Sequence, residues 1–391
     1  MRQDFKEIGH TGGKISFSIF GDDDGKVSFS TEYSSSSPFP ATLSGIYAHH
    51  TIGICSTLKL GGMGEPFNEP PLPECIPVFL ASDSEGKFGH DCPVCNKHFR
   101  SESLPVNSPL ICPYCGLHAA AHKFITKSQT KYVEHYVSQL YMAFETVRPG
   151  SEQVCEIDMD SIAGDLEKEP VPDYYYTSTA QQTEFKCQAC SRYNDIRGRF
   201  GYCSSCGTRN NKASFKEYLD TVREQVNKKG VRPEDAIKQI ISDFDSTCRN
   251  YVSELVKKVR MKRSRKNELT KIKFHEIDHF CEVLERNFDF KLKKPLSQNE
   301  YLVAKKLFLR RHVYEHNGGE ATEQYIRESD DTSVQIGELL RESIENVHSL
   351  SNILSKMIDV LHDDFLELFP PEKFFIEIKK QRDQRWSKNK E

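Results

Sequence analysis

Four C-x-x-C pairs constrain the fold of this chain more than any other feature of its sequence. Eight of the 13 cysteines form these pairs, which fall into two blocks: CPVC followed by CPYCG, and CQAC followed by CSSCG. Two pairs supply four thiolates, the ligand set of a closed tetrahedral zinc site. We therefore expect two zinc ribbons, although the spacing alone also allows the blocks to exchange partners. The predicted metal ligands are Cys92, Cys95, Cys112, Cys115, Cys187, Cys190, Cys203 and Cys206.

The first residues of the chain indicate what the cysteines do. The chain begins with MRQDFKEIGH, a polar segment, so we expect no secretory signal and a cytoplasmic protein. In the cytoplasm, paired cysteines typically bind metal and do not form disulfides. The longest uncharged stretch, residues 33–58, contains His49 and His50, so no membrane-spanning helix is expected. The formal net charge of -4 provides no global attraction to nucleic acid, and any electrostatic binding surface must be local.

A zinc site closed by four cysteines has no open coordination position. Such an ion cannot activate water, so its role is to hold together a ribbon that is too short for a hydrophobic core. We therefore expect two structural Zn²⁺ ions as cofactors and none for catalysis. A zinc deaminase is excluded, because that chemistry needs an H-x-E element and a P-C-x-x-C partner, whereas here proline follows the first cysteine.

The hydrophobic pattern predicts an α+β multidomain protein with a β-rich first part and an all-α second part. KISFSIF and KVSFSTEY alternate apolar and polar residues and predict a β-hairpin, and further strands are expected at 42–60 and 76–81. Beyond the second cysteine block the period is helical. Ser214 with Glu217, and Ser297 with Glu300, have the spacing of a capping box. The expected helices are 214–229, 233–261, 268–288, 298–316 and 334–366.

Composition shifts suggest the domain boundaries. Residues 152–173 hold eight acids and one lysine together with Gly164, Pro170 and Pro172, which is typical of a linker. The predicted organisation is a β-rich domain with a helix and the first ribbon (about 90–117) at 1–148, an acidic linker at 149–183, the second ribbon at 184–212, a helical bundle at 214–370 and a charged tail at 371–391.

Two basic segments are candidates for RNA contact. The second ribbon interleaves cations with Tyr193, Phe200 and Tyr202, a mixture that suits phosphate pairing and base stacking. Residues 257–273 contain nine Lys or Arg and one acid. In both segments the alternative is a solvated surface that binds no ligand. The candidate RNA-binding residues are Arg192, Arg197, Arg199, Arg260, Lys262, Arg263 and Arg265.

HEIDH, residues 275–279, matches the H-E-x-x-H motif of zinc peptidases. In that motif two histidines four residues apart on one helix bind the metal, the glutamate acts as base, and Glu300 would be a third ligand. However, Asp278 places a charge where the motif usually has an uncharged residue, and residues 214–273 show no strand pattern for a substrate-binding sheet. A metallopeptidase with Glu276 as base is therefore the least favoured alternative.

The segment LFLRRHVYEHNGG, residues 307–319, places two arginines and two histidines in an otherwise apolar helical run. Apolar residues cover most of the circumference of this helix, which predicts burial on more than one face. Asparagine and glycine accept left-handed conformations, so the helix should end at His316. The His316 side chain could then turn toward Arg311.

RHVYEH resembles the R-x-x-x-x-H motif of HEPN ribonucleases, and the trailing NGG and EATEQYI are similar to the same family. The resemblance extends over about residues 230–366. It implies a homodimer in which the two motifs meet in one cleft and cut RNA without a metal. It also implies that Arg311 clamps the phosphate, that His316 is the acid–base group and that His312 and Tyr314 support them, with Arg310 as the alternative arginine.

The expected function is therefore a HEPN-type endoribonuclease, with a toxin or antiviral defence role by family analogy alone. The expected partners are RNA, a second copy bound through the helical bundle, and a regulatory protein or nucleic-acid trigger bound through the N-terminal region. The alternative from another class is a non-catalytic binding module with a dimerising bundle. A purely structural alternative pairs Arg311 with a carboxylate such as Glu345 and leaves His316 to cap the helix end.

Overall fold

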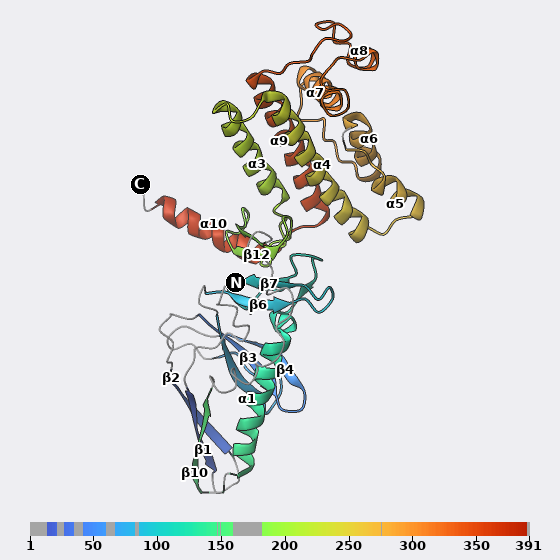
Figure 1. Cartoon of the computed structure of the whole chain (residues 1–391). Helices are drawn as coiled ribbons and strands as arrows, with labels where there is room; N and C mark the ends of the chain where they lie inside the picture. Colours follow the sequence, from blue (N-terminus) through green and yellow to red (C-terminus); the bar gives the residue numbers. More distant parts are fainter. Residues whose placement is uncertain are drawn as a thin grey trace. The chain divides into compact units, whose positions relative to one another are not determined.

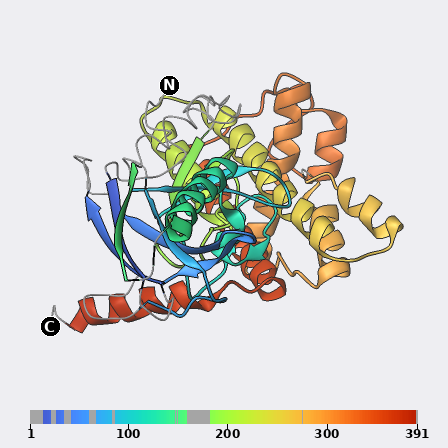
Figure 2. The same ribbon diagram turned by 90° about the horizontal axis from the view of Figure 1, so that it is seen from below.

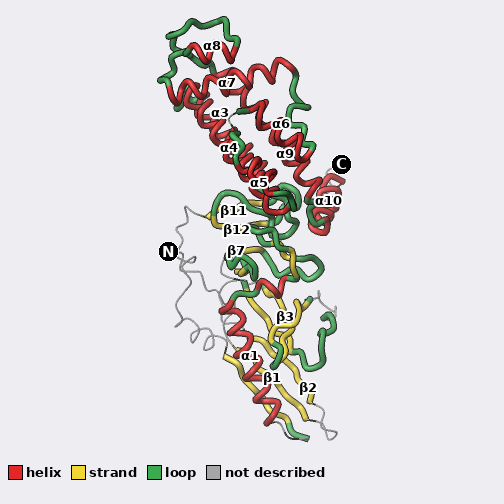
Figure 3. Tube along the Cα trace, turned by 90° about the vertical axis from the view of Figure 1, so that its right-hand side faces the viewer, coloured by secondary structure: helices red, strands yellow, loops and turns green. Residues whose placement is uncertain are grey.

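The protein is of mixed α/β structure and divides into two compact units, Met1–Thr208 with Glu372–Glu391, and Arg209–Pro371. The described strands lie in the first unit as antiparallel sheets, and helices build the second (Figure 3). Among the described helices, none has the length and apolar character needed to cross a bilayer. The computed structural model describes residues 14–21, 27–34, 42–59, 67–82, 86–146, 148, 150–158, 182–274 and 276–388.

A three-stranded antiparallel sheet with the order β4-β3-β5 forms the centre of the first unit. Its strands are β3 (Leu43–His49), β4 (Gly53–Leu58) and β5 (Ile76–Ala81), and helix α1 (Lys127–Thr146) contacts all three (Figure 1). The middle strand β3 is buried over most of its length because it has a neighbour on each edge and a helix on one face. Helix α1 buries one face through residues at intervals of four, namely Tyr132, Tyr136 and Leu140.

The predicted N-terminal hairpin is confirmed in its strands. β1 (Lys14–Gly21) and β2 (Val27–Ser34) pair antiparallel, while residues 22–26 between them lie outside the described part of the chain. The other edge of β1 pairs with β10 (Glu152–Asp158), a strand that was predicted to be part of the acidic linker. The many acids hid the alternation of this strand. Residues 159–181 of the predicted linker lie outside the described residues.

The two cysteine blocks share one sheet. In the first block β6 (Phe88–Asp91) and β7 (His98–Ser101) flank CPVC, and β8 (Leu110–Ile111) and β9 (His118–Ala119) flank CPYC. In the second, β11 (Gln182–Lys186) and β12 (Tyr193–Arg197) flank CQAC. The sheet order is β11-β12-β7-β6, so β12 of one ribbon pairs with β7 of the other.

A buried ion pair joins the ribbons at this seam. The Nε of Arg100 donates to Oδ2 of Asp195 at 2.8 Å, and both side chains are 4% exposed. Because desolvated charges are stable only when paired, this contact favours one register between the ribbons.

The C-terminal residues belong to the first unit. Residues 371–391 were predicted to be a charged tail, whereas Lys373–Lys388 forms helix α10, the red helix that ends at the C label in Figure 2. Its Phe375 is buried against the four cysteines of the second ribbon, and the guanidinium of Arg192 lies 4.5 Å from the centre of the Phe375 ring. The apolar residues at the start of this helix therefore cover the ribbon.

The second unit is a bundle around α4 (Pro233–Lys258), which contacts α3 (Asn211–Asn227), α7 (Gln298–His316) and α9 (Ile344–Leu368). Phe244 of α4 lies at the centre of the core. Its ring centre is 6.0–6.1 Å from those of Phe215, Phe280 and Phe308, which belong to three different helices.

The helix bounds partly agree with the predictions. The helix at 298–316 is confirmed, and Ser297 and Glu300 form the predicted capping box. The second predicted capping box is wrong, because α3 begins at Asn211 and Ser214 lies inside the helix. The helix expected at 268–288 is two helices, α5 (Arg263–Thr270) and α6 (Ile277–Phe288), and the start of the one expected at 334–366 is replaced by loop, with α8 (Glu323–Ser329) before it.

Candidate functional site

The last turns of α7 carry two adjacent rows of polar side chains. Arg311 pairs with Glu315 four residues later, with NH2 2.8 Å from Oε2. The rings of His312 and His316, also four residues apart, have their centres 4.6 Å from each other and are both exposed. Successive residues on a helix are separated by about 100°, so the histidine row lies beside the ion-paired row. The helix end thus presents a cation and two imidazoles.

Arg311 is only partly covered. Its side chain is 18% exposed, and its buried Nε has no acceptor among the described residues. The structural alternative expected Arg311 to pair with a carboxylate such as Glu345; Arg311 does pair with a carboxylate, but with that of Glu315 on its own helix. A partly exposed ion pair of this spacing is worth about 0.3–0.5 kcal/mol, so the pair with Glu315 contributes little to stability.

Arg310 is in a different environment from its neighbour. Its side chain is 8% exposed, and its NH2 lies 2.7 Å from Oδ2 of Asp331 while NH1 lies 3.1 Å from Oε1 of Glu342. Its Nε donates to the hydroxyl of Tyr325 at 2.8 Å, and that hydroxyl donates to Asp331 at 2.6 Å. The hydroxyl of Tyr314 donates to Glu342 at 2.6 Å. We call these five residues the Arg310 network.

The Arg310 network holds charges that would be costly if unpaired. Burial by itself raises the pKa of Asp331, but hydrogen bonds from Ser333, Tyr325 and Arg310 hold it well below its usual range. The network anchors the segment that follows α7 against the helix, because Asp331 and Glu342 both come from that segment. Arg310 is therefore paired inside the fold, whereas Arg311 is partly exposed and pairs with one carboxylate on its own helix.

The end of α7 has the backbone geometry that the Asn-Gly-Gly sequence predicts. The helix ends at His316, and the amides of Asn317 and Gly319 both donate to the carbonyl of Val313. Gly318 and Gly319 have φ values of 63° and 92°, which residues with a Cβ rarely adopt. His316 is consequently an exposed residue at a chain reversal.

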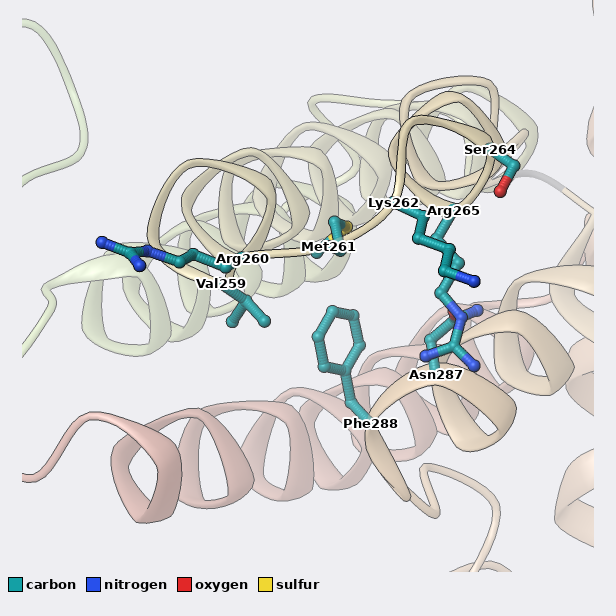
Figure 4. A pocket seen from close by; sticks show the side chains of 8 residues that line it. All are labelled: Val259, Arg260, Met261, Lys262, Ser264, Arg265, Asn287 and Phe288. Carbon is teal, nitrogen blue, oxygen red and sulfur yellow. The ribbon is translucent and has the colours of Figure 1, made fainter.

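A second polar site lies where α4 ends and α5 begins. The chain is extended between Val259 and Lys262, and a cavity of ≈ 450 Å³ opens beside this break. In Figure 4 the Phe288 ring lies in the middle of the cavity, Lys262 and Arg265 extend toward Asn287, and Arg260 points away at the opposite end. The lining residues are Val259, Arg260, Met261, Lys262, Ser264, Arg265, Asn287 and Phe288.

Two of the predicted RNA-binding residues of the basic segment, Lys262 and Arg265, thus lie on the same side of a cavity that holds an aromatic ring. Arg260, Lys262, Arg263 and Arg265 are exposed, and Phe288 is half-buried. Cations that can meet phosphates beside an aromatic face that can stack on a base are the elements of a single-strand binding site. Phe288 comes from α6, some 25 residues from the basic segment, so the sequence contained no signal that links them.

Two of the predicted RNA-binding arginines of the second ribbon make contacts within the protein that the sequence did not predict. Arg192 pairs with Glu102, with NH1 2.9 Å from Oε2, and stacks on Phe375. The guanidinium of Arg199 lies 4.8 Å from the Phe200 ring centre, and Tyr202 is buried. Of the three predicted arginines, Arg197 is the one that is exposed.

The eight predicted metal ligands come together in two groups, and each block forms its own group without exchange of partners. In each group two Sγ–Sγ distances are 3.6 Å, for Cys92–Cys115, Cys95–Cys112, Cys187–Cys206 and Cys190–Cys203. A tetrahedron with zinc–sulfur bonds of about 2.3 Å has sulfur–sulfur edges of about 3.8 Å. Both groups therefore suit a structural zinc ion.

The backbone of each C-x-x-C pair has the same turn. The residue after the second cysteine has a φ between 54° and 76°, and its amide donates to the carbonyl of the first cysteine at 2.8–2.9 Å. Gly116 and Gly207 fill this position in two turns, while Asn96 and Ser191 fill it in the others. The four turns are thus alike although only two contain glycine.

The H-E-x-x-H match does not lie within one helix. Helix α6 begins at Ile277, so Glu276 precedes it, and the Glu276 carboxylate pairs with Lys273 at 2.9 Å. His275 lies outside the described residues. Glu300, the suggested third ligand, forms the capping box of α7 and pairs with Lys356. These contacts give Glu276 and Glu300 other roles.

Comparison with protein-family models, with curated proteins and with solved structures finds no match for this chain.

Proposed function

We propose that this protein is a HEPN-type endoribonuclease that acts as a homodimer and needs no metal for catalysis. The observation that carries the proposal is the contrast between two adjacent arginines: Arg310 is held inside the fold, whereas Arg311 lies partly exposed beside two exposed histidines.

The chemistry follows from these groups. The imidazole of His316 removes the proton of a ribose 2′-hydroxyl, and the 2′-oxygen attacks the adjacent phosphorus. The bond from phosphorus to the 5′-oxygen breaks, and this oxygen takes a proton from the protonated form of His316 of the partner subunit. Arg311 donates to the phosphate oxygens while negative charge develops on them. The products are a 2′,3′-cyclic phosphate and a 5′-hydroxyl.

The test is cleavage of single-stranded RNA by the full chain in EDTA, with zinc analysis to show that the ribbons keep their metal. We expect cyclic phosphate ends, and Arg311→Ala and His316→Ala should each lower the rate by about 10²-fold or more. Lys306→Ala, a cation on the same helix, and His348→Ala, a half-buried histidine of the same unit, are the controls and should keep the wild-type rate. Wild-type cleavage by both site variants would reject the proposal.

The cavity beside Phe288 favours a second candidate, a non-catalytic nucleic-acid-binding module. The cavity volume of ≈ 450 Å³ lies within the usual range of about 300–1,000 Å³ for ligand pockets. The cations that line the cavity can bind a nucleic acid without any catalytic residue. This candidate predicts tight binding of RNA that stays intact over long incubation. In the nuclease proposal the same cavity holds the strand, and the toxin or defence role and the recognition of a trigger by the ribbons remain extensions by analogy.

A further inference from the structure

One end of the sheet β4-β3-β5 gathers metal-ligating side chains outside the cysteine clusters. His49 is the last residue of β3 and His50 begins the turn to β4. Glu74 lies just before β5, and because Ala48 pairs with Ile76, the residues that precede β5 reach the same end of the sheet as the two histidines. The pairing of β3 and β5 therefore brings together residues about 25 positions apart.

The ligand atoms of these three residues already face one another. One nitrogen of His49, one nitrogen of His50 and one carboxylate oxygen of Glu74 all lie within 4.8 Å of each other. The shortest of the contacts described joins Nε2 of His49 to Oε2 of Glu74 at 3.7 Å. Small rotations of the exposed His50 and Glu74 side chains can shorten such distances to the roughly 3 Å that separates ligands with metal bonds of about 2.0–2.2 Å.

Surrounding contacts orient the two imidazoles. Nδ1 of His49 accepts from the amide of Thr51 at 3.2 Å and lies 3.0 Å from the Thr51 hydroxyl oxygen, while Nε2 faces Glu74. A metal on Nε2 requires the other tautomer, in which Nδ1–H donates to the Thr51 hydroxyl. The His50 ring lies against the ring of Tyr141 on α1, with 4.1 Å between their centres. Partners that fix the ring orientation of a histidine are the usual supports of a metal ligand.

Glu74 is held in a conformation that is costly for a residue with a Cβ. Its φ is 64°, in the left-handed region, and the hydroxyl of Tyr141 donates to its carbonyl oxygen at 2.9 Å. Strain of this kind costs about 1–3 kcal/mol and persists where surrounding structure supports it, often at binding sites. Tyr141 thus contacts both His50 and Glu74 and positions them on the same side of the sheet end.

We infer that His49, His50 and Glu74 form a site for one divalent transition-metal ion such as Zn²⁺. Two imidazoles and one carboxylate are a common ligand set for such ions, and three protein ligands leave a coordination position for water or another small ligand. This site would differ from the cysteine clusters, which offer four thiolates each and leave no open position.

The test is titration of the full chain with Co²⁺ after its ribbons have been filled with zinc. We expect one Co²⁺ per chain with the weak visible bands of nitrogen and oxygen ligands and without the intense thiolate-to-cobalt absorption. His50→Ala and Glu74→Gln should weaken this binding by about tenfold or more, and His135→Ala, an exposed histidine of α1, should leave it unchanged. Thermal melts of the zinc-loaded variants establish that the fold is intact.

Two results would overturn the inference. One is a titration in which no Co²⁺ binds beyond the ribbon sites. The other is binding with equal affinity to wild type, His50→Ala and Glu74→Gln, which would place the metal elsewhere and leave His49 and Glu74 as an ion pair. X-ray absorption of the bound cobalt separates the sites independently, because a sulfur ligand in its spectrum would assign the metal to a ribbon.

Discussion

Replacing each of two adjacent arginines by alanine should separate stability from catalysis. Arg310→Ala leaves the carboxylates of Asp331 and Glu342 buried without their cation; these side chains are 3% and 0% exposed. Removing one partner of a buried ion pair costs about 3–5 kcal/mol. Arg311→Ala removes only a partly exposed pair with Glu315, worth about 0.3–0.5 kcal/mol. Arg310→Ala should therefore unfold far more easily.

The difference is large enough to measure by heating. For a unit of this size, 1 kcal/mol shifts the melting temperature by about 2–4 °C, so Arg310→Ala should lower it by about 6–20 °C and Arg311→Ala by about 2 °C or less. Helical circular dichroism reports the melting, and hydrogen exchange of α7 and α8 shows whether the loss lies in the Arg310 network. At temperatures where both variants are folded, RNA cleavage should be lost in Arg311→Ala.

The reverse pattern would refute this reasoning. If Arg310→Ala were as stable as wild type and lost cleavage, while Arg311→Ala kept it, Arg310 would be the ligand-binding arginine. A conservative control is Arg311→Lys, which keeps the charge but not the two-pronged donor geometry. It should melt like wild type and cleave more slowly, because a lysine cannot hold a phosphate with two parallel hydrogen bonds.

Three further predictions concern other parts of the molecule. Cys203→Ser should weaken zinc binding by the second ribbon, whose folding depends on a metal-binding free energy of about 10–16 kcal/mol in small zinc modules. Helix α10 should then be less well packed on the ribbon, which would appear as faster hydrogen exchange in residues 373–388. An unchanged zinc content would contradict this prediction. Burial lowers the pKa of His362 to about 4, so its neutral form is favoured in the folded state. The free energy of unfolding should therefore fall by up to about 3 kcal/mol as the pH drops from about 6.5 to about 4. Thermal melts at several pH values should show a weaker pH dependence for His362→Gln. Phe288→Ala should weaken single-stranded RNA binding by about 1–3 kcal/mol and leave its salt dependence nearly unchanged. Arg265→Ala should instead reduce the slope of the logarithm of the binding constant against the logarithm of salt concentration by about 1. Fluorescence anisotropy measures both, and equal slopes for the two variants would contradict a stacking role for Phe288 and a phosphate contact for Arg265.

Much of the local structure could be predicted from the sequence because its causes are local. The bounds of α7 follow from a capping box at one end and Asn-Gly-Gly at the other, since both act through hydrogen bonds within a few residues. The eight cysteine ligands follow from their short spacings in the same way, whereas the structure decided that each block forms its own cluster. The hairpin of β1 and β2 follows from alternation over neighbouring strands.

Only the tertiary structure decided which side chains are free to act. The sequence left Arg310 as the alternative to Arg311, and their environments differ because Asp331 and Glu342, more than 20 residues away, fold onto Arg310 and not onto Arg311. The ring of Phe288 joins the basic segment, and Glu74 joins His49 and His50, through pairings of distant elements. Such contacts depend on how helices and strands pack, and the residues that meet share no pattern in the sequence that would predict the contact.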